Sequence, residues 1–240
     1  MKKIKFSLSQ DVSLDLHLIE GIFEPTGTTK LLIDSVTSSC KSESGQKILD
    51  LGAGCGVVGI SLCKQGFMGS TMFASDLNNN SLQCMSLNAK EHQCEIIIRE
   101  GSIFEPWEGE KFDIIHIGDV IEHVNSPVDL IKFAVKHLDE NGKIIVRTPA
   151  AYHYNYVNLV KRQSTDLSNM EHMFYVLPIH MMEICRRSEI GLSSYLTLTR
   201  GGFTIRGVKK MLRALSQFKF KHCFAEIHTP PGNVYNNLCL

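Results

Sequence analysis

Four residues have the types and spacing needed for proton transfer or metal binding: Asp119, Glu122, His123 and, later in the chain, His172. Side chains three and four positions apart share one face of a helical turn, so Asp119, Glu122 and His123 would point the same way. Carboxylates and an imidazole suit Mg²⁺ or another hard-to-borderline divalent ion, and His172 is the candidate that would complete the set. The spacing therefore predicts a metal site at these four residues.

The same segment offers a second chemistry that needs no metal. An imidazole titrates near neutral pH, so His123 is a candidate general base that removes a proton from an acceptor group. Glu122, its neighbour, is the second candidate catalytic residue. A third interpretation is structural, in which the segment is a capped helix start whose acids contact the core or a cofactor. The residues alone leave these three interpretations open.

A second group of candidate residues surrounds the stretch KILDLGAGCGVVG at positions 47–59. A short apolar run carries the acid Asp50, and Gly52, Gly54 and Gly56 follow at alternate positions. Glycine is needed where the backbone turns tightly and a ligand lies against it. A strand, a glycine-rich turn and a helix form a nucleotide-type site at the end of a parallel strand. No G-K-[ST] follows, so the turn is not a phosphate loop.

A further acid, Asp76, ends the next apolar run, TMFASD at positions 71–76. A carboxylate at the end of a second parallel strand can accept two hydrogen bonds from ribose hydroxyls. Asp76 is therefore predicted to bind a sugar, and its alternative role is that of a helix N-cap.

These motifs resemble motif I and the second motif of class I S-adenosylmethionine-dependent methyltransferases, over roughly residues 45–150. The resemblance implies an α/β fold, a Rossmann-like doubly wound sheet of seven strands that is mostly parallel with an antiparallel last strand. It implies S-adenosyl-L-methionine as cofactor. In the family an acid often stands where Ser102 does, so this chain departs from the pattern there. The residues that the resemblance assigns to cofactor binding are Asp50, Gly52, Ala53, Gly54, Gly56, Asp76, Leu77, Ser102, Ile103 and Asp119.

The D-x-x-E-H segment with its distant histidine resembles the metal-binding E-x-x-E-H of small-RNA 2′-O-methyltransferases and of ubiquinone-pathway O-methyltransferases. Asp119 replaces the first glutamate and is shorter by one methylene. The first hypothesis is methyl transfer to an oxygen, or secondarily a nitrogen, of a small metabolite. Methylation of RNA or protein is the second, and a non-catalytic scaffold that binds the cofactor is the third.

Alternating strands and helices must position these residues. The apolar runs predict strands at 47–51, 71–76, 95–99, 112–117 and 143–147. A helix is expected at 128–138, with Gly142 closing it. The chain is expected to comprise an N-terminal lead-in and helix (1–45), a cofactor-binding core (46–150), and a substrate-covering insertion with closing strands of the same domain (151–240). In that last part we expect a helix at 178–187, strands at 193–199 and 219–228, and a helix with one basic face at 205–215.

Composition limits the classes of function. The 240 residues are 43% hydrophobic and 21% charged, which is enough apolar material for a sizeable core. Because 25 basic residues balance 25 acidic ones, a nucleic-acid partner is not expected, and a small-molecule substrate is. No apolar run approaches the roughly 20 residues of a membrane span. Eight cysteines without a C-x-x-C pair predict reduced thiols and a cytoplasmic protein.

Overall fold

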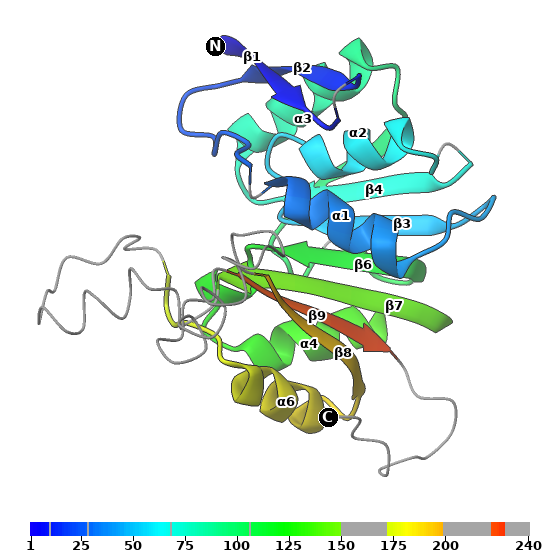
Figure 1. The fold of residues 1–240 in the computed structure, drawn as a ribbon, viewed down its shortest axis with the longest axis vertical. Coiled ribbons are helices and arrows are strands. Elements are labelled where there is room, and N and C mark those ends of the chain that lie inside the picture. Colours follow the sequence, from blue (N-terminus) through cyan, green and yellow to red (C-terminus); the bar gives the residue numbers. More distant parts are fainter. Residues whose placement is uncertain are drawn as a thin grey trace, which may run out of the picture. The chain divides into compact units, whose positions relative to one another are not determined.

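A computed structural model describes residues 1–9, 11–27, 29–67, 69–105, 107–149, 172–198 and 222–228 of the chain (Figure 1). The chain divides into two compact units. The first comprises residues 1–118 and 132–145, and the second comprises residues 119–131 and 146–240. The domain boundaries expected at residues 45 and 150 stay a prediction.

The first unit is built on parallel strands that alternate with helices. Its elements are β1 (Lys2–Ser7), β2 (Ser13–Leu18), α1 (Thr29–Ser39), β3 (Lys47–Leu51), α2 (Val57–Lys64), β4 (Thr71–Asp76), α3 (Asn79–Glu91), β5 (Ile96–Glu100) and β6 (Phe112–Gly118). β1 and β2 form an antiparallel hairpin, whereas β3 pairs in parallel with β4 and β6, and β4 with β5. β3 and β4 are almost wholly buried, as expected for strands covered on both faces.

An aromatic cluster fills the core of the first unit. The fully buried Trp107 ring meets Phe73 of β4 edge-to-face at a centroid distance of 5.6 Å and Phe112 of β6 at 5.8 Å. Such edge-to-face pairs place a ring's positive edge against a negative face. The indole Nε1 donates a hydrogen bond of 3.2 Å to Ser75 Oγ, so this polar atom is paired as well.

One boundary prediction is wrong. Helix α4 (Pro127–Lys136) ends before the expected position, and strand β7 (Leu138–Pro149) begins well before residue 143, so Gly142 lies inside the strand. At the end of α4, Lys111 Nζ donates a hydrogen bond of 2.9 Å to the Lys136 carbonyl oxygen. Glycine is needed at 142 for packing instead, because a Cβ there would lie 2.8 Å from the Leu138 side chain and 3.0 Å from the Phe112 carbonyl oxygen.

The second unit contains the 3₁₀-helix η1 (Ile121–His123), α6 (Pro178–Arg187), and the antiparallel strands β8 (Gly191–Leu198) and β9 (His222–His228). Hydrogen bonds join the strands in the order β5-β4-β3-β6-β7-β9-β8, and β7 contributes residues to both units. The predicted mostly parallel, Rossmann-like α/β fold is thus confirmed, as is the helix at 178–187. The expected helix at 205–215 lies outside the described residues.

No helix in the described ranges combines the length and apolar character that crossing a bilayer requires. Free thiols are found at Cys55, Cys63, Cys84, Cys94 and Cys185. Burial raises the pKa of the Cys55 thiol to about 12, so this group stays protonated and unreactive at neutral pH.

Asn88 of α3 links the N-terminal hairpin to the glycine-rich turn. Its buried side-chain amide donates to the carbonyl oxygens of His17 and Cys55, at 3.1 and 3.0 Å, and accepts from the His17 N–H at 2.6 Å. Asn88→Ala would leave these three backbone groups unpaired, so we expect the free energy of unfolding to fall by about 2–4 kcal/mol in urea titrations. Ser86→Ala on the exposed side of the same helix is the control, and an equal loss there would contradict this assignment.

Candidate functional site

The glycine-rich turn between β3 and α2 is held against the end of β4. The N–H groups of Gly52 and Ala53 both donate to the Ser75 carbonyl, at 2.9 and 3.1 Å. Gly52, Gly54 and Gly56 have φ angles of 69°, 55° and 80°, a left-handed conformation that side chains oppose. The alternate glycines of the sequence therefore mark alternate left-handed residues, and these produce the tight turn of the backbone.

Two of these glycines face different surroundings. A Cβ added at Gly56 would lie 2.6 Å from Met85 Cγ of α3, so this glycine is needed for contact between the turn and a helix. A Cβ added at Gly54 would meet nothing within 4 Å. The turn thus packs on the protein at Gly56 and leaves bare backbone beside open space at Gly54.

Asp76, at the end of β4, joins the turn to the start of α3. Its two carboxylate oxygens accept hydrogen bonds of 2.9 Å, one from the Gly54 N–H and one from the Asn78 N–H. The N-cap of α3 is Asn78, whose side chain accepts from the Asn80 N–H. The helix N-cap, which was the alternative role for Asp76, is thus Asn78. Because a carboxylate has about four lone-pair sites, each oxygen of Asp76 keeps one for a ligand.

Asp50 is buried in β3 and bonds to a residue that sequence reasoning missed. Its Oδ1 lies 2.7 Å from Nδ1 of His116, the residue directly opposite on β6. Both side chains are buried, with 8% and 1% of their surfaces exposed. Among the residues that the structure describes, Asp50 Oδ2 and His116 Nε2 have no hydrogen-bond partner. A histidine inside the apolar strand FDIIHIG was the available signal.

The remaining predicted cofactor residues of this unit surround the same strand ends. Leu77 directly follows Asp76, and its side chain is 72% exposed, whereas Ala53 in the turn is buried. Ser102 follows β5, where its hydroxyl accepts a local hydrogen bond of 3.3 Å from the Phe104 N–H. Ile103 is partly buried beside it. The structure assigns none of these residues a ligand, so their roles stay predictions.

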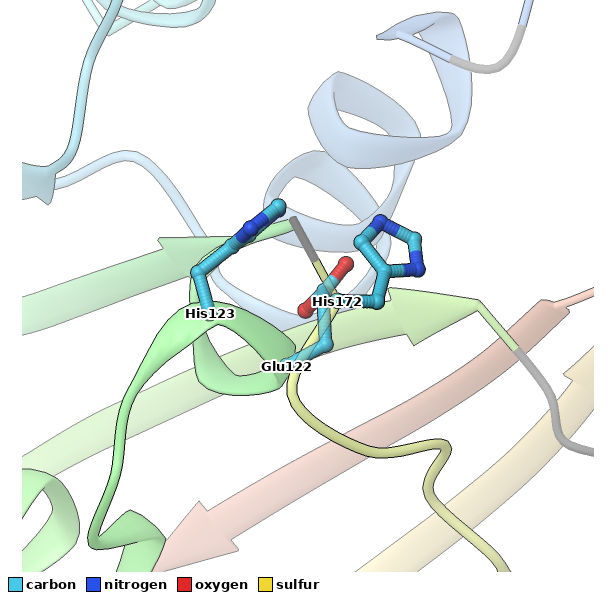
Figure 2. A group of neighbouring side chains, drawn as sticks. All are labelled: Glu122, His123 and His172. Atoms are coloured by element: carbon cyan, nitrogen blue, oxygen red, sulfur yellow. The ribbon is translucent and has the colours of Figure 1, made fainter. Parts of the chain in front are cut away.

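In the second unit, Glu122, His123 and His172 come together (Figure 2). One potential ligand atom from each lies within 4.8 Å of the other two, and the two imidazole rings are edge-to-face at 4.8 Å. The Met173 N–H donates to the Glu122 carbonyl at 2.8 Å, which fixes the backbone next to His172 against η1. The structure therefore brings His172 close to Glu122 and His123, as the sequence suggested.

Glu122 is the buried member of this cluster. Its Oε2 accepts a hydrogen bond of 2.9 Å from Thr148, whereas Oε1 has no partner among the described residues. Burial, and to a lesser extent the nearby Asp119 carboxylate, raise the pKa of Glu122 to about 8. A buried carboxyl of this kind is ready either to exchange a proton near neutral pH or to take a cation that stabilises its ionised form.

Asp119, the fourth residue of the predicted metal set, faces a different partner. Its carboxylate forms an ion pair with the buried Arg147, and its N–H donates to the Arg147 carbonyl at 2.8 Å. Its φ of 53° is a left-handed value that aspartate tolerates better than most residues. The structure thus brings three of the four residues together and places Asp119 with an arginine instead.

Comparisons with known proteins identify the family of this chain. The family model of the methyltransferase small domain matches residues 26–177. The ubiquinone biosynthesis O-methyltransferase of Rickettsia canadensis is 30% identical over 133 residues, which cover 55% of this chain and 53% of that protein. The enzyme of the same name from Pasteurella multocida is 28% identical over 141 residues, covering 54% and 57%. The chain thus spans about half the length of these curated relatives.

Solved structures share the fold. Magnesium protoporphyrin IX methyltransferase from Synechocystis PCC 6803 with bound S-adenosylhomocysteine superimposes with a TM-score of 0.62 at 14% identity, over 88% of this chain and 90% of that one. Phosphoethanolamine N-methyltransferase 2 of Haemonchus contortus, in complex with S-adenosyl-L-methionine, gives a TM-score of 0.63 at 15% identity, over 84% and 52%. Because the family model covers more than half of the chain and the fold agrees with it, this protein belongs to the methyltransferase small domain family, within the class I S-adenosylmethionine-dependent methyltransferase superfamily.

Proposed function

We propose that this protein transfers a methyl group from S-adenosyl-L-methionine to an oxygen atom of a small molecule. The observation that carries the proposal is the turn at Gly52–Gly56, which leaves bare backbone at Gly54 next to the carboxylate of Asp76. A nucleoside needs this combination, because its ring system requires room along the backbone and its sugar hydroxyls require an acceptor. Family membership and the fold support the same cofactor.

The residues present fit this cofactor. Asp76 has lone pairs left for the two ribose hydroxyls, and Asp50 Oδ2 is a buried acceptor without a partner in the described part of the chain. When bound, the cofactor supplies a methyl group on a sulfonium, which leaves as a neutral thioether. The chain's task is then to orient the donor, exclude water and prepare the acceptor.

Two alanine substitutions separate ligand space from protein packing in the turn. Both Gly54→Ala and Gly56→Ala place a side chain at a left-handed residue, which costs about 1–2 kcal/mol. Gly56→Ala also pushes into Met85, so we expect it to lose about 1–3 kcal/mol more in urea unfolding. Gly54→Ala is expected to show the larger loss of S-adenosylhomocysteine affinity in calorimetry, tenfold or more, because its methyl enters the ligand's space. Equal effects of the two variants on affinity would contradict this placement.

An oxygen acceptor must lose its proton, and the cluster of Glu122, His123 and His172 offers two ways to arrange this. His123 can act as a general base, with the Glu122 carboxylate beside it. Alternatively, a divalent cation held by the three residues would supply Lewis-acid chemistry that lowers the pKa of an acceptor hydroxyl. The orphaned, buried Oε1 of Glu122 fits a cation, and we favour this arrangement.

The donor set argues for the kind of ion. With Asp119 paired to Arg147, one carboxylate and two imidazoles remain. Imidazole nitrogens suit borderline ions such as Mn²⁺, Fe²⁺, Co²⁺ or Zn²⁺, whereas Mg²⁺ takes mainly oxygen ligands. The sequence-based prediction included Mg²⁺ and other hard-to-borderline divalent ions, and among these we prefer a borderline transition ion as the occupant.

The curated relatives are ubiquinone biosynthesis O-methyltransferases, and this supports a hydroxylated small molecule as acceptor. The test is release of S-adenosylhomocysteine, measured by mass spectrometry, from S-adenosylmethionine with separate panels of phenols and catechols, amines, peptides and short RNAs. We expect turnover with hydroxylated small molecules, loss on adding EDTA, and better recovery with Mn²⁺ than with Mg²⁺. Turnover with RNA or peptides alone would overturn the proposal of a small-molecule acceptor. Full activity in EDTA would overturn the proposal of a divalent cation and leave His123 as the general base.

A further inference from the structure

The Asp50–His116 pair has a chemistry that the glycine-rich turn and Asp76 do not use. An ionised carboxylate only accepts hydrogen bonds, so the hydrogen in the 2.7 Å contact belongs to His116 Nδ1. A neutral imidazole with its hydrogen on Nδ1 has an acceptor at Nε2. With the imidazole in this neutral form, the pair carries two buried acceptors, Asp50 Oδ2 and His116 Nε2, and neither atom has a hydrogen-bond partner among the residues that the structure describes.

The free nitrogen of His116 points along β6 toward the end of the strand. His116 and Gly118 lie two positions apart and thus on the same face of the strand. A Cβ added at Gly118 would lie 2.6 Å from His116 Cε1 and 3.0 Å from Nε2, so the imidazole extends over Gly118. Gly118 is the last residue of β6, and parallel α/β sheets bind their ligands at these carboxyl ends.

Leaving two polar atoms buried and unpaired is unfavourable, so their natural occupant is a ligand rich in N–H groups. A water molecule has two hydrogens to donate but carries no charge to balance the buried Asp50 carboxylate. A primary ammonium has three N–H donors and a positive charge. In S-adenosylmethionine and S-adenosylhomocysteine this group is the α-ammonium of the amino-acid portion, opposite the nucleoside end.

We propose that His116 is a positioning residue for the amino-acid end of the cofactor: it orients the Asp50 carboxylate and presents Nε2 as a second acceptor to the cofactor's ammonium group. The inference rests on the proposed cofactor but not on the identity of the methyl acceptor. It divides the cofactor between two carboxylates, with Asp76 holding the sugar and the Asp50–His116 pair holding the ammonium.

The test compares three ligands by calorimetry on the full chain. S-adenosylhomocysteine has the whole amino-acid portion, its decarboxylated analogue keeps the ammonium alone, and 5′-methylthioadenosine lacks both charged groups. His116→Phe keeps a ring of similar size without nitrogen atoms, whereas His116→Asn keeps a donor near the position of Nδ1 and loses the acceptor at Nε2. The control is His137→Phe. His137 is another buried histidine of the same unit and directly precedes β7, and its Nδ1 lies 3.1 Å from the Glu110 carbonyl oxygen.

We expect His116→Phe to lower the affinity for S-adenosylhomocysteine and for its decarboxylated analogue at least tenfold, and the affinity for 5′-methylthioadenosine by less than twofold. For His116→Asn we expect an intermediate loss of affinity for the first two ligands. His137→Phe should not discriminate among the three ligands. Equal weakening of all three ligands, or of none, would overturn the proposal in favour of a purely structural pair. Loss confined to S-adenosylhomocysteine would assign His116 to the carboxylate instead and overturn the ammonium assignment. If His116→Phe does not fold, His116→Asn decides by the same ratios. No binding of S-adenosylhomocysteine by the unchanged protein would overturn the cofactor itself.

Discussion

Replacing Glu122 by glutamine is expected to lower kcat by about 10²–10⁴-fold while the affinity for S-adenosylhomocysteine changes by less than about twofold. Glutamine has nearly the same shape and can still accept the hydrogen bond from Thr148, so the fold should persist. What it loses is the ionisable carboxyl group, which either balances a cation in its ionised form or exchanges a proton beside His123. Binding should survive because the proposed cofactor contacts are made by the Gly52–Gly56 turn, Asp76 and the Asp50–His116 pair, and none of them is assigned to Glu122.

The measurement is steady-state kinetics on the best acceptor from the screen, together with calorimetry. Glu183→Gln is the matched control, because Glu183 is an exposed glutamate of α6 in the same unit and pairs, within the described ranges, with Arg186 and Arg187. We expect that control to keep full activity. Unchanged kcat in Glu122→Gln would exclude the cluster from the reaction, and a parallel loss of cofactor affinity would mean that Glu122 acts through the cofactor site.

Replacing Asp76 by asparagine is expected to raise the Kd for S-adenosylhomocysteine by about 100-fold, since two charge-assisted hydrogen bonds to ribose hydroxyls are worth about 1.5 kcal/mol each. The new amide nitrogen would also face the N–H of Gly54 or Asn78, where only an acceptor fits. The loss should therefore appear as weaker binding of every ligand that contains the ribose, 5′-methylthioadenosine included.

Asp113→Asn is the matched control. Asp113, near the opposite, amino-terminal end of β6, also accepts a backbone hydrogen bond, from the Lys47 N–H at 2.7 Å. Its replacement should cost stability without changing Kd. Similar Kd values for Asp76→Asn and the unchanged protein would contradict the proposal that Asp76 binds the ribose.

The sequence was sufficient for the parts of the fold that depend on local pattern. The apolar runs at 47–51 and 71–76 coincide with β3 and β4, and the helix expected at 178–187 coincides with α6. These segments have few alternatives, because continuous apolar runs bounded by glycine or polar residues are typical of buried parallel strands. The left-handed glycines of the turn follow from their spacing for the same reason.

Features set by tertiary contacts were not predictable in this way. Gly142 has the sequence position of a helix terminator, but glycine is needed there because Leu138 and Phe112 leave no room for a side chain. Asp119 fits a metal motif by spacing, yet Arg147, which is 28 positions away, takes its carboxylate. His116 was overlooked because its importance arises only when β3 and β6 pair in register and bring it opposite Asp50. In each case at least one deciding partner, namely Phe112, Arg147 or Asp50, is distant in the chain.

The candidate catalytic cluster lies between these extremes. The motif singled out Glu122 and His123 by local spacing, and resemblance suggested His172 across a long gap. The structure brings the three together. The environment of Glu122, buried with one oxygen bound to Thr148 and its pKa raised, had no counterpart in the sequence because it depends on burial.

The central claim is that an S-adenosyl nucleoside lies against the backbone between Gly52 and Gly56. A crystal structure of the protein with S-adenosylhomocysteine tests this most directly. The account predicts both ribose hydroxyls within hydrogen-bond distance of the Asp76 carboxylate and the ligand's chain passing beside Gly54. A nucleoside bound at another edge of the sheet, or an Asp76 side chain turned away from the sugar, would contradict it.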